Sequence, residues 1–322
     1  MPGTPQSIPA FLPRTGCPFC GNAGGRELAA VDYLDTAEAH SDLPNVRGKA
    51  RACPDCGVAY PSHVYDPRAF TDFYAKSFID LDYFDRSPLQ AARMAAMRRI
   101  MRDRHRRFSL SSALDSVLLH TLQVPFLGRE PKGLKVLDVG CGFGEFSRIF
   151  RELGNEVACT EIFPALAERM RGLGFECQLG ELEEQDFGAR RFDVVLLRAV
   201  FYRTREPART LRKVLGLLAP GGEIALVDPC PGEEGVAYYL CKQFPQGQFY
   251  ILDQERYLAM LRERFGLACT RRLLIYGRPQ APLRKVRLVG NFVGFGELLL
   301  NNLLRRKPYV LAYNLVRAAD LG

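Results

Sequence analysis

Short apolar runs alternate with amphipathic segments along most of the chain after Gly133. The short runs predict strands over 134–139, 156–162, 175–179, 192–198, 222–228 and 267–276. The amphipathic segments between them predict helices near 144–153, 164–173, 206–218 and 254–264. Pro220, Gly221 and Gly222 stop the third of these helices and turn the chain into the next strand. This order predicts an α/β fold with a Rossmann-like, doubly wound and mostly parallel sheet.

Other segments flank this core, which we place at 132–280. Residues 1–13 predict a disordered lead, and residues 14–66 carry two close pairs of cysteines with little helical pattern. Residues 67–131 predict mostly helix, serving as a lid or linker. Residues 281–322 predict a C-terminal helix followed by a final strand over 308–318.

Composition narrows the class of protein. The chain has 322 residues and a formal charge of +8, which permits anionic partners without requiring them. No apolar run reaches the ~20 residues of a membrane span. The N-terminus has four prolines and no charged region before an apolar one, so we expect no signal peptide. Six of the ten cysteines are scattered among apolar residues, which favours a reducing, cytoplasmic location.

The stretch "VLDVGCGFGE" places three glycines between a predicted strand and a predicted helix. A dinucleotide site needs G-x-G-x-x-G to take a pyrophosphate on a helix N-terminus. Here the third glycine, Gly144, comes one residue early, and Glu145 fills the expected position. Asp138 and Glu145 would both repel a pyrophosphate and attract a cation. The turn therefore favours an adenosine ligand with positive charge and no phosphate, as in S-adenosylmethionine.

Four ordered motifs make the chain resemble the class I S-adenosylmethionine-dependent methyltransferases. They are "VLDVGCGFGEFS", Glu161 closing the second strand, "RFDVVLLRAVFY" and "VLGLLAPGGEIALVD". The resemblance implies S-adenosylmethionine as cofactor and S-adenosylhomocysteine as product. It implies that the glycines pass under the methionine part of the cofactor and that Asp138 holds its ammonium side. It implies that Glu161 meets the ribose, that Ile162 also contacts the cofactor, that Glu181 and Leu182 meet the adenine, and that Arg198 lies beside the methionine. The residues it assigns to the cofactor in this core are Asp138, Gly140, Gly142, Gly144, Glu161, Ile162, Glu181, Leu182 and Arg198.

Two matched stretches, "CPFCG" and "CPDCG", carry the paired cysteines Cys17, Cys20, Cys53 and Cys56. Two intervening residues let both sulfurs of a pair turn onto one ion, and the following glycine permits the tight turn. Four thiolates select Zn²⁺ in a tetrahedral zinc-ribbon geometry. A filled four-cysteine site leaves no open position, so we predict a structural zinc that folds a small module.

The cysteine pairs followed by the glycine motif resemble zinc-ribbon-bearing methyltransferases of bacterial natural-product and sugar pathways. By that resemblance the N-terminal module and the helices form a lid over the cofactor cleft. Tyr83, in "DLDYFD", is then a lid residue that contacts the cofactor.

The sequence departs from this family after the fourth strand. Relatives often carry a Glu-His pair there, whereas this chain has Tyr202 and Arg203. The usual histidine base is missing, so the proton transfer is unassigned. Among Tyr202, Glu233, Glu234, Tyr238 and Tyr239 we favour Tyr202, because it follows the strand end beside the cofactor. We expect "PCPGEEGVAYYLC" (229–241) to bind the acceptor.

Residues 93–107 hold seven arginines, which raises a second interpretation, an RNA base methyltransferase with a zinc finger. The stretch lacks interleaved aromatics for base stacking, so we do not expect a nucleic-acid partner. A third interpretation is a catalytically inactive cofactor-binding partner protein. We predict methylation of a small-molecule biosynthetic intermediate at oxygen or carbon. The apolar tail at 292–304, with three basic residues after it, suggests a hydrophobic or anionic acceptor, and a homodimer surface explains it equally well.

Overall fold

The computed structural model describes residues 11–32, 47–66, 88–104, 127–233, 235–236, 247–276, 300, 303–304 and 309–318. Several predictions lie outside these ranges: the helices expected within 67–87 and 105–126, Tyr83, and the acceptor-segment residues Glu234, Tyr238 and Tyr239. Most of the helix expected before the final strand lies outside them too.

A seven-stranded sheet forms the centre of the molecule, in the order β12-β13-β10-β9-β6-β7-β8. Its strands are β6 (Lys135–Val139), β7 (Glu156–Glu161), β8 (Glu176–Leu179), β9 (Phe192–Arg198), β10 (Leu218–Pro229), β12 (Leu267–Tyr276) and β13 (Tyr309–Ala318). The first five run parallel, and β13 lies antiparallel between β10 and β12. This arrangement confirms the mostly parallel, Rossmann-like fold.

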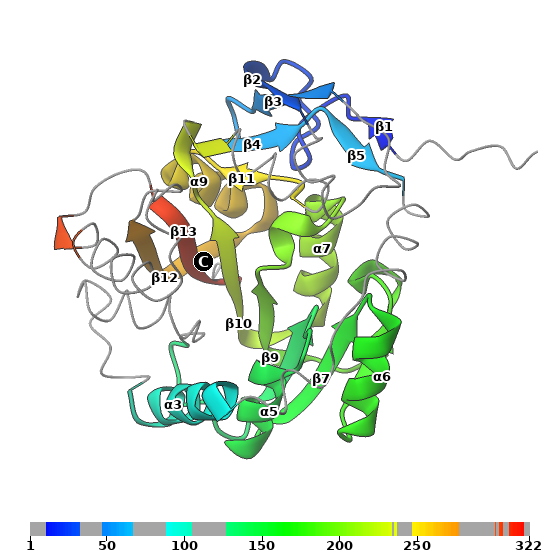
Figure 1. Cartoon of the computed structure of the whole chain (residues 1–322), viewed down its shortest axis with the longest axis vertical. Coiled ribbons are helices and arrows are strands. Elements are labelled where there is room, and N and C mark those ends of the chain that lie inside the picture. The colour runs from blue at the N-terminus through cyan, green and yellow to red at the C-terminus, as the bar shows by residue number, and fades with distance from the viewer. Residues whose placement is uncertain are drawn as a thin grey trace, which may run out of the picture.

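Strand side chains alternate between two apolar layers, as a sheet buried on both faces requires. In β9, Val195 and Leu197 join the cluster that includes α7 (Pro207–Leu217) and α9 (Gln254–Phe265). Val194 and Leu196 join the opposite cluster, which includes α3 (Pro88–Arg104) and α5 (Glu145–Glu152). The helix α6 (Pro164–Gly172) packs on β7 and β8 at one edge of the sheet (Figure 1).

Helix boundaries follow local signals. The Asp253 side chain accepts hydrogen bonds from the backbone amides of Glu255 and Arg256 at the start of α9, and Gly266 ends this helix with a φ of 63°. The turn predicted at Pro220 to Gly222 is instead part of β10, which starts at Leu218 and shifts register against β9 before Glu223. The strand therefore begins earlier than the proline and glycines suggest.

Two smaller sheets lie across the α7 and α9 side of the core (Figure 1). One pairs β1 (Phe11–Pro13) with β5 (His63–Tyr65). Residues 11–13 are thus ordered by strand pairing, although the sequence places them in a disordered lead. The other sheet joins β2 (Arg26–Asp32), β3 (Arg47–Ala52) and β4 (Val58–Pro61) with β11 (Tyr250–Ile251).

The strand β11 comes from the core and completes the N-terminal sheet, because Tyr250 and Ile251 pair antiparallel with Ala59 and Val58. The two parts of the chain therefore share backbone hydrogen bonds as well as side-chain contacts. Among the helices that the structure describes, none combines the length and the apolar character needed to cross a bilayer.

Candidate cofactor site and cysteine cluster

A cavity of about 230 Å³ lies at the carboxyl ends of the parallel strands, where open α/β sheets bind ligands. Val139 closes β6, Glu161 closes β7 and Ala199 follows β9, so each strand end contributes to the wall. The lining residues are Val139, Gly140, Gly142, Thr160, Glu161, Ile162, Phe163, Leu166, Gly180, Glu181, Leu182, Glu183, Ala199, Val200, Arg203, Thr204, Arg205, Glu206 and Gln248.

The glycine turn forms one edge of this cavity. Gly140, Gly142 and Gly144 have φ values of 64°, 56° and 75°, a region that side chains disfavour. Gly144 also caps α5, and a Cβ there would lie 2.3 Å from Met170 Sδ. The turn therefore needs glycine at this position both for backbone conformation and for helix packing.

Glu161 organises the backbone around the turn. Its Oε2 accepts a hydrogen bond from the Gly142 amide at 2.7 Å. Its Oε1 accepts from the amides of Ile162 and Phe163 at 2.8 and 3.0 Å. Burial raises the pKa of Glu161, and these three amides offset part of that rise because they stabilise the carboxylate. Glu161 thus lines the cavity and also joins the glycine turn to the loop after β7 through its hydrogen bonds.

Glu181 and Leu182 form the opposite wall, where the chain leaves β8 and enters the short helix η2 (Leu182–Glu184). Leu182 is buried, and burial raises the pKa of Glu181. The positive charge of Arg205, which also lines the cavity, lowers that pKa again in part. Acidic and basic groups therefore both face this end of the cavity.

Asp138, Glu145 and Arg198 lie behind the turn and are not among the lining residues. Asp138 accepts a hydrogen bond from Ser147 Oγ at 2.6 Å, and burial raises its pKa to about 6. Glu145 forms an ion pair with Arg93 of α3. Of the acidic residues singled out in the sequence, Glu161 and Glu181 line the cavity, whereas Asp138 and Glu145 do not. Glu183 and Glu206 add two further carboxyl groups to the wall.

Arg198 ends β9 with its guanidinium carbon 4.1 Å from the centroid of the Phe146 ring. Burial lowers its pKa, and the neighbouring charges of Asp138 and Glu145 oppose that shift. The next residue, Ala199, has a φ of 53°, which is uncommon outside glycine and is found at sites under functional constraint.

Tyr202 lies in the short helix η3 (Phe201–Arg203), and only 3% of the residue is exposed. Its hydroxyl accepts a hydrogen bond from Arg203 Nε at 2.9 Å. Burial raises the pKa of Tyr202. Arg203 lines the cavity, whereas Tyr202 is not among the lining residues.

Gln248 and the turn from Thr204 to Glu206 also form part of the wall, and no sequence pattern predicted them. Gln248 is 3% exposed, and its backbone amide donates a hydrogen bond to the Tyr202 carbonyl at 2.7 Å. Gln248 precedes β11 and is far in sequence from the other residues of the wall, so no local pattern indicates its position. The turn from Thr204 to Glu206 follows η3, a few residues after the predicted fourth strand, and that position is the signal that could have identified it.

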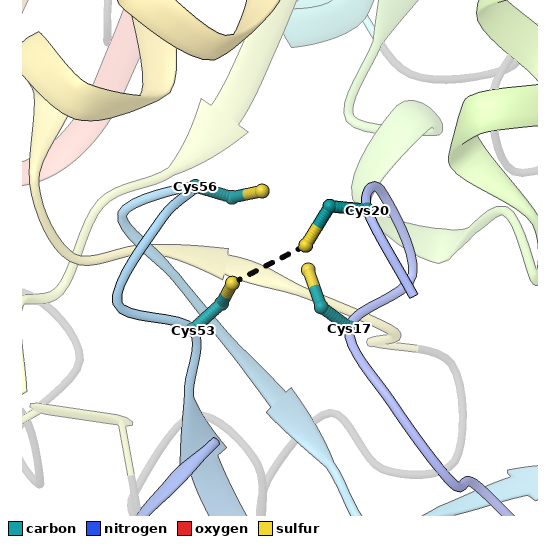
Figure 2. A group of neighbouring side chains, drawn as sticks. All are labelled: Cys17, Cys20, Cys53 and Cys56. Atoms are coloured by element: carbon teal, nitrogen blue, oxygen red, sulfur yellow. Dashed lines mark hydrogen bonds between the residues drawn. The ribbon is translucent and has the colours of Figure 1, made fainter. Parts of the chain in front are cut away.

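Cys17, Cys20, Cys53 and Cys56 come together as the sequence predicts (Figure 2). Their Sγ atoms all lie within 4.8 Å of one another, and Cys20 Sγ lies 3.6 Å from Cys53 Sγ. Sulfurs bound at ~2.3 Å to one tetrahedral ion would lie about 3.8 Å apart. The spacing and the all-thiol composition of the cluster therefore fit Zn²⁺.

The cluster sits directly against the core. The Phe19 ring, inside the first cysteine pair, makes edge contacts with Phe201, Phe249 and Tyr257 at centroid distances of 6.0, 4.9 and 6.1 Å. Behind the second pair, the Gly57 carbonyl accepts hydrogen bonds from the amides at residues 252 and 253. A Cβ on Gly57 would lie 2.6 Å from the Asp253 carbonyl oxygen. The loops that carry the cysteines are thus part of the main apolar core.

The fold and the strand-end cavity define a Rossmann-like methyltransferase architecture. A family described as "Methyltransferase domain" matches residues 96–271, more than half of the chain. The chain belongs to this family.

Curated relatives match smaller parts. The ubiquinone biosynthesis O-methyltransferase of Xanthomonas axonopodis pv. citri is 28% identical over 137 residues, covering 38% of this chain and 57% of the relative. The tRNA U34 carboxymethyltransferase of Desulfotalea psychrophila is 32% identical over 134 residues, covering 37% of this chain and 41% of the relative. The chain therefore spans only about half the length of the curated relatives it matches.

Among solved structures, an S-adenosylmethionine dependent methyltransferase from Mesorhizobium loti matches with a TM-score of 0.44 and 20% identity, covering 59% of this chain and 93% of that one. A SAM dependent methyltransferase from Archaeoglobus fulgidus matches with a TM-score of 0.41 and 17% identity, covering 63% of this chain and 92% of that one.

Proposed function

We propose that this protein transfers a methyl group from S-adenosylmethionine to an oxygen or carbon atom of a small-molecule intermediate. The observation that carries the proposal is the cavity at the carboxyl ends of β6, β7 and β9. It is bounded by the glycine turn, by Glu161 and by the Glu181–Leu182 wall. A turn with bare backbone and a carboxylate one strand away suits a nucleoside with a free ribose.

In this proposal the chain binds and orients, and the cofactor supplies an electrophilic methyl group when bound. Gly140 and Gly142 allow close approach to the backbone. Glu161 accepts from the ribose hydroxyls beside Ile162, and Leu182 packs on the adenine next to Glu181. Gly144, Asp138 and Arg198 support the turn from behind, since they hold α5 and the strand ends in place. Orientation and exclusion of water then favour in-line transfer.

The proton acceptor is a separate part of the proposal. Tyr202 is our candidate from sequence, and two observations count against it: its hydroxyl is bonded to Arg203 behind the wall, and burial raises its pKa. A proton acceptor should have a pKa near the working pH. The variant Tyr202→Phe separates the alternatives. If Tyr202 is the base, the variant should lose turnover and keep its cofactor affinity. If Tyr202 only packs, the variant should keep both turnover and cofactor affinity.

We also propose that the four-cysteine cluster holds a structural Zn²⁺. The supporting observations are the mutual distances of the four sulfurs and the burial of Cys17, Cys53 and Cys56. Four protein ligands leave no position for a substrate or water, so the metal serves folding.

An RNA substrate is the second candidate, because one curated relative is a tRNA U34 carboxymethyltransferase. The arginines of α3 favour it less: Arg93 is paired with Glu145 and Arg98 with Glu152, and Met97 and Met101 are buried. Affinity for a mixed RNA pool that falls steeply with salt would favour this candidate.

Calorimetry with the full chain tests the cofactor assignment. We expect saturable one-to-one binding of S-adenosylhomocysteine and no binding of NAD or ATP at the same concentrations. Binding of NAD or ATP in place of S-adenosylhomocysteine would contradict the proposal. Turnover with any acceptor would exclude the third interpretation, an inactive cofactor-binding partner.

A further inference from the structure

Arg14 connects the cysteine module to the cofactor cavity. It lies between β1 and the first cysteine pair, and its backbone amide donates to the Ser62 carbonyl at 2.8 Å. Its backbone therefore continues the β1–β5 pairing by one hydrogen bond and lies just before Cys17, the first cysteine of the cluster.

The guanidinium of Arg14 reaches the other part of the chain. Its Nη2 donates to the carbonyl oxygen of Arg205 at 3.1 Å and to Gln248 Oε1 at 3.0 Å. Both acceptor residues line the cavity. Arg14 Nε is sealed from solvent and has no hydrogen-bond partner among the described residues. Arg14 is part-buried, and because its Nε has no acceptor in the described part of the chain, the guanidinium depends strongly on the two acceptors of its Nη2.

The two acceptors belong to two segments that form one side of the cavity wall. The Arg205 carbonyl lies one residue before Glu206, the N-cap of α7, and the turn from Arg203 to Glu206 lines the cavity. Gln248 is tied to η3 through its backbone bond to the Tyr202 carbonyl. A single side chain from the N-terminal module thus joins the turn before α7 to the loop before β11.

We propose that Arg14 is a positioning residue that links metal binding in the cysteine module to cofactor binding in the cavity. The inference rests on the proposed function, since it takes S-adenosylhomocysteine and Zn²⁺ as the two ligands. Because a metal-filled cluster fixes the backbone that presents Arg14, filling one site stabilises the wall of the other. Thermodynamic linkage makes the effect reciprocal.

The first measurement uses the unmodified protein. Zinc release to a metallochromic chelator is followed with and without saturating S-adenosylhomocysteine. We expect bound S-adenosylhomocysteine to raise the zinc affinity of the protein, so that the chelator must be at least about fivefold more concentrated to remove the same amount of zinc. Fivefold is about the lower end of typical coupling between sites. If S-adenosylhomocysteine binds but does not change zinc release, the link is overturned and the proposed function stands. Failure to bind S-adenosylhomocysteine at all overturns both.

The second measurement uses Arg14→Met, which keeps the apolar stem and removes the donors. We expect at least about a tenfold weaker S-adenosylhomocysteine affinity, loss of the zinc protection, and full zinc content. Arg26→Met is the matched control, because Arg26 also joins the module to the core, through an exposed ion pair with Glu233. We expect it to leave both readouts unchanged.

A merely structural role would lower stability without removing the coupling between the two ligands. Arg14→Met with normal S-adenosylhomocysteine affinity and normal zinc protection therefore overturns the proposal. If that variant fails to fold, Gln248→Met removes one acceptor from the opposite side, and retained coupling in Gln248→Met contradicts the link. Arg14→Lys, which keeps a charged donor, is expected to recover part of the coupling.

Discussion

The cysteine cluster and the glycine-turn cavity satisfy their polar groups in different ways. In the cluster, four side chains from two separate loops converge within 4.8 Å, and as thiolates they would need a cation to balance their charge. In the cavity, Glu161 accepts hydrogen bonds from three backbone amides, and the positive φ of Gly142 favours a residue with no side chain. A single substitution in the cysteine cluster should therefore abolish metal binding, because all four side chains act on one ion. A single substitution in the cavity should only reduce cofactor affinity, because much of that site is backbone.

The largest effect is expected from removing one sulfur ligand. Cys56→Ser should reduce bound zinc from one equivalent per chain to nearly none and lower stability by several kcal/mol, because metal binding contributes directly to folding. Elemental analysis and thermal unfolding measure both effects. Cys269→Ala, at a half-buried cysteine in β12 outside the cluster, is the control and should keep its zinc. A Cys56→Ser protein with full zinc content would contradict a four-cysteine site.

A graded loss is expected in the cavity. Glu161→Gln keeps the shape but turns an amide donor toward one of the backbone N–H groups, so that amide loses its acceptor. We expect affinity for S-adenosylhomocysteine to fall about 10- to 100-fold, corresponding to about 1.4 to 2.7 kcal/mol. Glu176→Gln, on the exposed end of β8, should bind normally. Equal affinity of both variants in calorimetry would remove Glu161 from the site.

Asp228 sharpens the contrast, because it is a buried carboxyl group at the end of β10 with no cation to balance it among the described residues. Burial raises its pKa to about 8, and neither carboxylate oxygen has a partner within hydrogen-bond distance in the same set. The Tyr202 amide and the Tyr257 hydroxyl lower that pKa only in part, from longer range.

The sign of the pH effect follows from this raised pKa. Above about pH 4 the unfolded chain releases the Asp228 proton, while the folded protein keeps it up to about pH 8. Stability should therefore fall as pH rises across this window, by at most about 1.4 kcal/mol per pH unit. Asp228→Asn should flatten this slope in denaturant titrations between pH 6 and pH 8. A variant with the slope of the parent protein would show that Asp228 ionises freely in the fold.

The smallest expected effect compares two glycines with positive φ. Gly144→Ala and Gly154→Ala both strain the backbone, with φ values of 75° and 87°. Only the Cβ at Gly144 has a close neighbour, Met170 Sδ at 2.3 Å, whereas that at Gly154 has open space within 4 Å. We expect each to cost about 1 kcal/mol for the backbone, and Gly144→Ala about 1 kcal/mol more, because Met170 must move. Equal unfolding free energies would mean that the thioether moves freely.

Sequence patterns predicted the core well where the information is local. The strands predicted at 192–198 and 267–276 coincide with β9 and β12, and the helix predicted at 164–173 differs from α6 by one residue. Alternating apolar residues, Pro164 at a helix start and Gly266 at a helix end are signals within a few residues. The two cysteine pairs were equally readable, because each repeats its own spacing.

Long-range contacts were not predictable in this way. Nothing near Gln248 in sequence indicates that it meets Arg14, since the two are separated by 234 residues. The pairing of Glu145 with Arg93 likewise depends on how α3 packs against α5. Such contacts follow from the assembled fold, so the sequence could not show that Glu145 is paired with Arg93 outside the cavity lining.

The pairing of β11 with β4 has a consequence for the order of events during synthesis. All four cysteines leave the ribosome early, but the β4 edge that adjoins them finds its backbone partner only after residues 250 and 251 have been made. Until then the nascent module carries an open strand edge, which is a template for wrong pairing. If the cluster takes up its proposed Zn²⁺ early, the metal would hold the first loops in a compact state through this interval, and zinc-starved cells should then accumulate aggregated protein.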